Sequence, residues 1–301
     1  MKNMPDKLLD YDSIIPDFRE FASSLSDSLR VFIRVNTIKT TAADVERLLA
    51  QKGVGLEKTP VPLFYSMKYD DKPLSMAEYH QGYLFHQGIT SAMAVIALDT
   101  GPGQTALDLC AAPGGKTTYL AQVMNDTGMI VANDRRHRRL AALMANVKRL
   151  GITNTVVTSG RGEHFSCSMG FDRVLVDAPC SGEGKWRVSP ERGVEHMRGG
   201  NTDLPAIQKG LLKRGFDMLA PGGILVYSTC TYNPEENEGV VSYLLRKRRA
   251  RVLEWNPPLE SSPGVLNFME KIYDDECGKC RRFYPHKTGA GGFFVARIAH
   301  A

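Results

Sequence analysis

The sequence predicts a doubly wound α/β fold behind a small α+β domain, because short apolar runs and amphipathic helices alternate after residue 100. Five of these runs read as strands of one parallel sheet: 106–109, 129–132, 154–157, 173–176 and 223–227. They show no polar alternation, which is typical of strands covered by helices on both faces. A sixth run, 292–298, is expected to close the sheet at one edge.

The helices between these runs are predicted from apolar residues at helical spacing. Between the second and third runs, the stripe comprises Leu140, Leu143, Met144, Val147 and Leu150, and before the fifth run it includes Leu204, Ile207, Leu211 and Leu212. Each stripe provides an apolar face that can pack on the sheet.

The first hundred residues are expected to form a separate small domain. Its predicted elements are a strand and two helices, at 31–35, 42–51 and 89–98. Thr41 is a suitable cap for the first helix. The turn-forming residues 101–104 then separate this part from the alternating pattern. The predicted domains are therefore 1–100, a small α+β unit, and 101–301.

The composition is that of an ordinary globular chain. Of 301 residues, 43% are hydrophobic and 24% are charged, which argues against collagen-like, low-complexity and disordered chains. No apolar stretch approaches the roughly 18 residues of a membrane span, and no signal-peptide core follows Met1. We therefore expect a cytoplasmic protein that makes no use of a membrane.

The net charge of +5 is unevenly distributed. The first hundred residues carry 11 lysines and arginines and 13 acidic residues, whereas the remainder carries 27 and 20. Two dense basic runs, 135–139 and 246–251, belong to this surplus. A solvated helix face would account for one such run, but two are also compatible with a polyanionic partner.

The loop after the first strand, 108–117, has the composition of a ligand-binding turn. In an open α/β sheet the ligand binds at the carboxyl ends of the strands, and the first strand-to-helix loop is the usual place. Small residues and two glycines allow a ligand to approach the backbone, and the following helix offers its amide end. A phosphate-binding P-loop is excluded, since that motif requires glycine where Cys110 stands.

Asp134, at the end of the second predicted strand, is placed to accept hydrogen bonds from ribose hydroxyls. A nicotinamide cofactor and S-adenosylmethionine would both use such an acid. The loop and Asp134 therefore indicate an adenosine-type cofactor without identifying the reaction.

Two cysteines follow the fourth and fifth predicted strands. Cys180 lies in Asp-Ala-Pro-Cys-Ser-Gly and Cys230 in Ser-Thr-Cys-Thr. In the common doubly wound order these strands are neighbours, about 4.8 Å apart, so both thiols are expected at the same sheet edge as the loop. A single buried cysteine is usually inert, but two at this edge favour chemistry, with a redox disulfide as an alternative.

Methylation of an unactivated aromatic carbon would use this arrangement. Cytosine C5 is a poor nucleophile until a thiolate adds to C6, which makes C5 able to attack a sulfonium methyl group. A second thiol could then act as a base and help to release the product. An acid such as Asp177 could hold the N3 or N4 edge of the base and stabilise the adduct.

Together these motifs resemble those of the RsmB/RsmF (NOP/Sun) family of RNA cytosine-5 methyltransferases. The resemblance rests on segments 107–117, 177–182 and 228–231, in that order, with further similarity at 34–37, 284–287 and 292–296. It implies a Rossmann-like, S-adenosylmethionine-dependent methyltransferase that acts on an unstacked or single-stranded cytosine in rRNA or tRNA. Residues 101–301 would then be the catalytic domain, and residues 1–100 would help to grip the RNA.

The resemblance also assigns roles to residues. By this likeness Cys230 would attack C6, Cys180 would promote product release, and Asp177 and Lys116 would contact the base. The residues that would hold S-adenosylmethionine are Cys110, Ala111, Ala112, Pro113, Gly114, Gly115, Lys116, Asp134, Arg139 and Asp177. No obligate protein partner is evident.

The chain departs from the family after the third strand, where relatives offer a further aspartate near the adenine. Segment 158–163 has none, so Glu163 or a backbone group would take its place. Cys277 and Cys280 have half the spacing of a zinc site without a second pair, so no metal is expected. Trp186 is equally compatible with ordinary packing and with stacking on a base.

Three other functions are open at this stage. A DNA cytosine-5 methyltransferase would use the Pro-Cys thiol, Cys180, as its nucleophile and would not need Cys230. A nicotinamide-dependent oxidoreductase on the same sheet would have no use for paired thiols. A non-catalytic RNA-binding scaffold would need neither cysteine.

Overall fold

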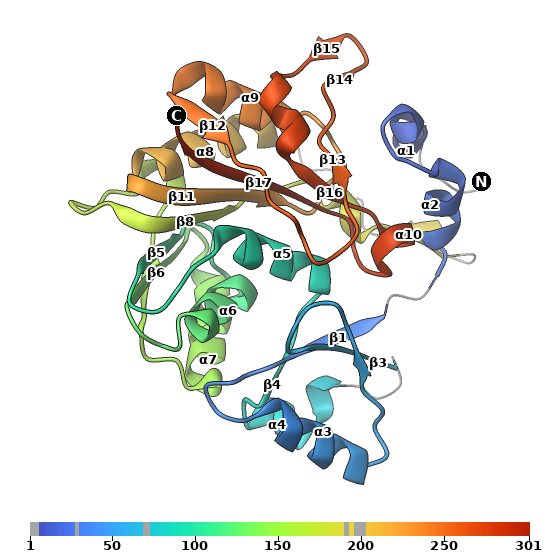
Figure 1. Ribbon diagram of the computed structural model, residues 1–301, viewed down its shortest axis with the longest axis vertical. Helices are drawn as coiled ribbons and strands as arrows, with labels where there is room; N and C mark the ends of the chain where they lie inside the picture. Colours follow the sequence, from blue (N-terminus) through green and yellow to red (C-terminus); the bar gives the residue numbers. More distant parts are fainter. Residues whose placement is uncertain (1–5, 28–29, 69–72, 190–192, 196–202) are drawn as a thin grey trace.

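The computed structural model describes residues 6–27, 30–68, 73–189, 193–195 and 203–301. Two sheets organise this part of the chain, a nine-stranded mixed sheet and a four-stranded antiparallel sheet, and helices pack on both (Figure 1). This arrangement confirms the predicted α/β class.

Five neighbouring strands of the large sheet run parallel and correspond to the five predicted runs. They are β5 (Thr105–Asp108), β6 (Met129–Asp134), β7 (Thr155–Ser159), β8 (Phe171–Asp177) and β11 (Leu219–Thr229). Their order is β11-β8-β5-β6-β7. Because β8 and β11 are parallel neighbours, with Ser228 opposite Asp177, the segments that carry Cys180 and Cys230 leave the sheet side by side.

The last predicted strand is interior, which corrects the expectation that 292–298 closes the sheet at an edge. Strand β17 (Phe293–His300) pairs antiparallel with β11 on one side and with β12 (Ala250–Val252) and β16 (Arg281–Phe283) on the other. Strand β13 (Ser262–Pro263) pairs with β16 in turn. These outer strands are two or three residues long and largely polar, so they contain no apolar run that a sequence pattern reveals.

Helices cover both faces of the parallel strands (Figure 1). On one face lie α5 (Ile89–Leu98), α6 (Gly115–Val123) and α7 (His137–Leu150), and on the other α8 (Leu204–Asp217) and α9 (Glu238–Lys247). Successive residues of a strand pack into the cores on opposite faces of the sheet. Val174 packs with residues of α8, whereas Leu175 packs with residues of α5. Burial on both faces accounts for the continuous apolar runs.

The small sheet has the order β2-β3-β1-β4. Its strands are β1 (Val31–Val35), β2 (Glu57–Lys58), β3 (Phe64–Met67) and β4 (Leu84–His86). Helix α3 (Ala42–Gln51) packs on one face, where Ile33 and Val45 share a core. The helix begins as predicted, with Oγ1 of Thr41 accepting a hydrogen bond from the amide of Asp44 at 3.2 Å.

Two segments of the first hundred residues pack against the large sheet. One is α5, and the other is the N-terminal pair α1 (Asp6–Leu9) and α2 (Phe18–Ser24), whose Leu8 and Phe21 belong to the core on the α8 face. The rings of Phe21 and Tyr232 meet edge to face, 5.2 Å apart. The division of the chain at residue 100 stays a prediction.

The remaining elements are short: η1 (Asp10–Ser13), η3 (Pro73–Ser75), α4 (Ala77–His80), η4 (Gly162–His164), η5 (Glu183–Lys185), β9 (Arg187–Ser189), β10 (Gly193–Glu195), β14 (Asn267–Phe268), β15 (Lys271–Ile272), η6 (Asp275–Lys279) and α10 (Pro285–Thr288). Within the described ranges, no helix has both the length and the apolar character needed to cross a membrane.

Candidate active site

The loop between β5 and α6 makes a tight turn that only glycine fits. Gly114 has φ +105°, and a Cβ atom there would lie 2.8 Å from the side chain of Leu143 on α7. The amide of Ala111 donates to the carbonyl of Asn133 at 2.8 Å, which ties the loop to the end of β6. The loop is therefore a fixed cradle at the carboxyl edge of the sheet.

Asp134 lies at the other wall of this cradle. Its buried carboxylate accepts hydrogen bonds from the amides of Ala112 at 3.2 Å and Arg136 at 2.9 Å. Arg139 contacts both the loop and Asp134. Its guanidinium donates to the carbonyl of Ala112 and lies 3.7 Å from the Asp134 carboxylate. Each carboxylate oxygen of Asp134 keeps a lone pair for a further donor.

Asp108 is buried beneath the loop. Its carboxylate accepts hydrogen bonds from the hydroxyl of Thr117 at 2.8 Å and from the amide of Cys110 at 3.4 Å. Burial raises the pKa of Asp108 to about 7. Burial, together with the charge of Asp108, also raises the pKa of Cys110 well above that of an ordinary thiol. Cys110 is thus a neutral loop residue and a poor nucleophile.

Lys116 and Asp177 form an ion pair, with Nζ 2.7 Å from Oδ2. The hydroxyl of Ser228 donates to the other carboxylate oxygen of Asp177 at 2.9 Å. The Lys116 ammonium also lies 5.0 Å from the ring centre of Phe293 at the start of β17. Two residues that only the family resemblance connected are therefore in direct contact.

The two predicted thiols also meet, with 3.2 Å between Sγ of Cys180 and Sγ of Cys230. The Cys230 amide donates to the Cys180 sulfur at 3.3 Å. Both side chains are partly exposed. The expectation that they emerge at one edge of the sheet is met in the geometry.

The contact between the sulfurs makes the two cysteines chemically different. The hydrogen bond from the Cys180 thiol lowers the pKa of Cys230, although burial acts in the opposite direction. The ammonium groups of Lys185 and Lys116 lower the pKa of Cys230 further. The hydrogen bond to Cys230, together with burial, raises the pKa of Cys180 well above its usual value. Cys230 is therefore the better thiolate and Cys180 the proton donor.

Polar contacts join the loops that carry the two cysteines. The hydroxyls of Ser181 and Thr231 lie 2.7 Å apart, and Thr231 donates to the buried carboxylate of Glu183 at 2.9 Å. The Glu236 carboxylate accepts from the amide of Ser181 and from the side chain of Gln208, both at 2.9 Å. These contacts hold the two loops in fixed positions relative to each other.

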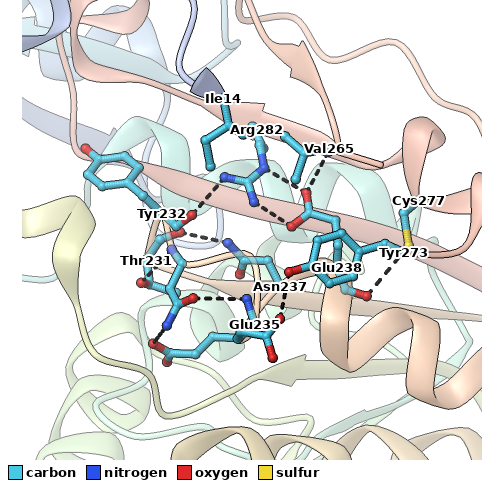
Figure 2. Close-up of polar contacts among 12 residues, drawn as sticks. Ile14, Thr231, Tyr232, Glu235, Asn237, Glu238, Val265, Tyr273, Cys277 and Arg282 are labelled. Atoms are coloured by element: carbon cyan, nitrogen blue, oxygen red, sulfur yellow. Dashed lines mark hydrogen bonds and ion pairs between the residues drawn. The ribbon is translucent and has the colours of Figure 1, made fainter. Parts of the chain in front are cut away.

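A buried ion pair lies behind the segment that follows Cys230 (Figure 2). The Arg282 guanidinium donates to both carboxylate oxygens of Glu238 and to the carbonyl of Tyr232, the last at 2.9 Å. The side chain of Asn237 donates to the carbonyl of Thr231 at 3.0 Å. Both partners of the ion pair are almost completely buried.

The supporting acids Glu183, Glu236 and Glu238 were missed in the sequence. One available signal is the run Asn-Pro-Glu-Glu-Asn at 233–237, which places turn residues and acids directly after a strand near a predicted thiol. Arg282 has no comparable signal, because it is 44 residues from its partner.

Glu163, the suggested substitute for the missing aspartate, lies in η4. Its carboxylate is 3.6 Å from the Arg161 guanidinium, and its side chain lies against α8 at Gly210. Its charge contributes to the raised pKa of Cys110, so it is near the loop. A role for Glu163 at the adenine stays a prediction.

Trp186 and the two cysteines at 277 and 280 are packed in the interior. Trp186 is buried, which fits ordinary packing. Cys277 and Cys280 are fully buried, and the described part of the chain contains no group of three or more His, Cys, Asp or Glu side chains arranged for a metal. Cys277 instead lies 3.3 Å from the hydroxyl of Ser242.

The two basic runs lie at opposite ends of the sheet. Residues 135–139 follow the carboxyl end of β6 and enter the start of α7, on the same edge as the loop, and are exposed. Residues 246–251 run from the last turn of α9, which returns from the carboxyl edge, into β12, and Arg248 there is paired with Asp217 at 2.6 Å. Only the first run is placed to meet a ligand at the candidate site.

Comparison with known proteins gives consistent results. A family model described as 16S rRNA methyltransferase RsmB/F matches residues 95–299. The chain is 36% identical, over 99% of its length and 96% of the relative, to the tRNA (cytosine(49)-C(5))-methyltransferase of Pyrococcus abyssi. It is 38% identical, over 89% of its length, to the human 28S rRNA (cytosine(4447)-C(5))-methyltransferase, of which it covers only 34%.

Among solved structures, the chain is similar to a methyltransferase homolog protein from Pyrococcus horikoshii. The TM-score is 0.83 with 32% sequence identity, over 95% of this chain and 91% of the other. The similarity extends over both sheets.

Proposed function

The chain belongs to the RsmB/F family of RNA methyltransferases, and we propose that it methylates C5 of a cytosine in ribosomal or transfer RNA with S-adenosylmethionine as methyl donor. One observation carries the proposal: the thiols of Cys180 and Cys230 lie 3.2 Å apart beside the Lys116–Asp177 ion pair.

The cradle fits an adenosine-type donor. S-adenosylmethionine, when bound, supplies a methyl group on a positively charged sulfur. The fixed loop 110–116 would contact it, and Asp134 would accept hydrogen bonds from ribose hydroxyls with its remaining lone pairs. Arg139 would hold the carboxylate of Asp134 and the loop in place.

Cys230 would begin the reaction on the base. Its lowered pKa favours the thiolate, which forms a bond to C6 while the electron pair of the C5–C6 double bond moves into the ring toward C5. Asp177 would accept a hydrogen bond from the cytosine amino group, and Lys116 would keep that carboxylate oriented. The target base has to be unstacked to reach both groups.

Cys180 would complete the reaction by helping to release the product. The hydrogen bond to the Cys230 thiolate is the largest cause of the raised pKa of Cys180. Once Cys230 is bonded to C6 it carries no charge, so this cause disappears and Cys180 can lose its proton to water. After C5 has taken the methyl group, with cleavage of the donor's methyl–sulfur bond, the Cys180 thiolate would take the C5 proton. The double bond then re-forms, and Cys230 leaves as a thiolate. One proton is released per methyl transferred.

The assignment predicts different behaviour for two alanine variants. Cys230→Ala should abolish methyl transfer, whereas Cys180→Ala should accumulate a covalent enzyme–RNA adduct that is visible on a denaturing gel. Cys167→Ala, at a partly exposed cysteine outside the site, serves as the control and should behave like the wild type. An adduct from Cys230→Ala would exchange the two roles, as expected for a DNA-type enzyme.

The relatives do not agree on the class of RNA. Those named above act on transfer RNA in one case and on ribosomal RNA in the other. Bisulfite sequencing of total RNA from a strain that lacks the gene, compared with its parent, identifies the cytosine that loses its methyl group.

A further inference from the structure

The side-chain amide of Gln87 is buried without a hydrogen-bond partner. The residue is 5% exposed, and within the described part of the chain neither Nε2 nor Oε1 finds a donor or acceptor. A buried amide without partners costs free energy, and most native structures avoid it. Such a group is therefore expected to serve a ligand.

The strand pairing places Gln87, the residue that follows β4, on the face of the small sheet that packs against α5 and α6. Arg34 of β1 is paired with Phe85 of β4, and the backbone amide of Gln87 donates to the carbonyl of Phe32 at 3.2 Å. Side chains two residues apart share a face, so Gln87 lies on the face of Phe85. Phe32 and Phe85 belong to the core that α5 and α6 share.

Gln87 lies directly against the start of α6. A methyl group on Gly115 would be 4.0 Å from Cδ of Gln87 and 3.4 Å from the ring of Phe85. The next residue, Lys116, forms the ion pair with Asp177. The unpartnered amide is thus a neighbour of the groups that would hold the base.

The surrounding contacts favour the substrate side of the loop over the cofactor side. Helix α5, which begins two residues after Gln87, packs on β8, β11 and β17, the strands beside the two thiols. Thr90 on that helix donates to the carbonyl of Gly291 at 2.9 Å, two residues before Phe293. Asp134, which marks the cofactor side, lies on β6 in the other direction along the sheet.

We propose that Gln87 is a further substrate-binding residue whose side-chain amide hydrogen-bonds the unstacked target pyrimidine nucleotide. This inference rests on the proposed function. Nε2 donates to an oxygen of the nucleotide and Oε1 accepts from one of its N–H or O–H groups, which satisfies both halves of the amide only when RNA is bound. The small sheet therefore contributes directly to the site, not only to the surface that grips the RNA.

The test is Gln87→Met, which keeps the length of the side chain and removes its polar atoms. Methyl transfer from labelled S-adenosylmethionine into total RNA from a strain that lacks the gene gives kcat/KM for RNA. Calorimetry with S-adenosylhomocysteine gives cofactor affinity, and thermal unfolding gives stability. We expect kcat/KM for RNA to fall by about tenfold or more, with unchanged cofactor affinity and an unchanged or higher Tm, since an unsatisfied amide is removed.

Gln122→Met is the matched control. Gln122 is also buried and lies on α6, but only its Oε1 lacks a partner in the described part of the chain, whereas its Nε2 donates to the carbonyl of Val35 at 3.0 Å. This variant should lower Tm and leave the RNA kinetics within about twofold. Gln87→Leu, with a different apolar shape, repeats the test if methionine packs badly.

Three results would overturn the inference. Weaker binding of S-adenosylhomocysteine by the Gln87 variants would place the amide at the cofactor. Unchanged kinetics with RNA would leave it without a role, and a lower Tm with proportional loss of every activity would make it structural. Failure of the wild-type protein to label cytosine would instead contradict the proposed function, so the two failures are distinct.

Discussion

The hydroxyl of Tyr11 donates a hydrogen bond to the buried carboxylate of Glu183, at 3.1 Å from Oε2. This contact joins the N-terminal segment to the loop that follows Cys180, although 172 residues separate the two. Glu183 also accepts a hydrogen bond from the hydroxyl of Thr231, the residue next to Cys230. The segment around η1 is therefore part of the structure that aligns the two thiols.

Tyr11→Phe should weaken this alignment. Removing the hydroxyl takes a donor from a fully buried carboxylate, which costs about 1–3 kcal/mol of unfolding free energy. We expect a lower Tm and a lower kcat, because Cys180 and Cys230 lose part of their common support. Urea unfolding and steady-state methyl transfer measure both. Tyr65→Phe, whose hydroxyl donates to Glu46 away from the site, should lower stability without changing kcat.

Breaking the buried pair of Arg282 and Glu238 should be far more destabilising. Arg282→Met leaves the Glu238 carboxylate buried and uncompensated, at a cost of about 3–5 kcal/mol. The double variant Arg282→Met with Glu238→Leu should recover much of this loss, since neither charge then remains. Chemical denaturation of the three proteins checks the order. Equal stability of the single variant and the wild type would contradict it.

An exposed ion pair is the control for the buried pair of Arg282 and Glu238. Arg47 and Asp44 lie 2.8 Å apart at the start of α3, with both side chains largely in solvent. Arg47→Met should change the unfolding free energy by no more than about 0.5 kcal/mol. The contrast separates the effect of burial from that of charge.

Much of the candidate site was predictable because it follows from strand order. Cys180 and Cys230 come directly after neighbouring parallel strands, so a general rule about doubly wound sheets brings them together. Asp134 is in place for the same reason, at the end of the strand on the other side of β5. Each of these predictions needs only a local motif and one topological rule.

The contacts that hold the site in place were not predictable in this way. Glu183 and Glu238 meet Tyr11 and Arg282 across 172 and 44 residues, and no periodic pattern relates such distant positions. The interior position of β17 was not predicted for a similar reason, because the strands outside it are too short to show an apolar pattern in the sequence. Nothing in the sequence indicates that the side-chain amide of Gln87 is buried.

The Cys230 thiolate should form at a lower pH than an ordinary thiol. Cys180 donates the hydrogen bond that lowers the pKa of Cys230, so the rate of alkylation of Cys230 by iodoacetamide should reach half its maximum below the free-thiol value of about 8.5. In Cys180→Ala that donor is absent, and the midpoint should move to higher pH. Mass spectrometry of the labelled peptide measures the rate. Equal midpoints in the two proteins would show that Cys180 does not stabilise the thiolate.

Asp108 should make the protein less stable as the pH rises toward neutrality. Its folded pKa is raised to about 7 by burial, against about 3.9 in an unfolded chain, so between these values the folded state holds a proton that the unfolded state has released. The unfolding free energy should fall with pH across this window, by up to about 1.4 kcal/mol per pH unit, and Asp108→Asn should lack this slope. In that variant the hydroxyl of Thr117 can still donate to the oxygen of the introduced side-chain amide. Asp172, whose pKa is lowered by hydrogen bonds from Thr105, gives the opposite sign: its stabilising effect is lost only as the pH falls through the acid range. Parallel curves for the wild type and Asp108→Asn between pH 4 and 7 would mean that Asp108 is already ionised beneath the loop.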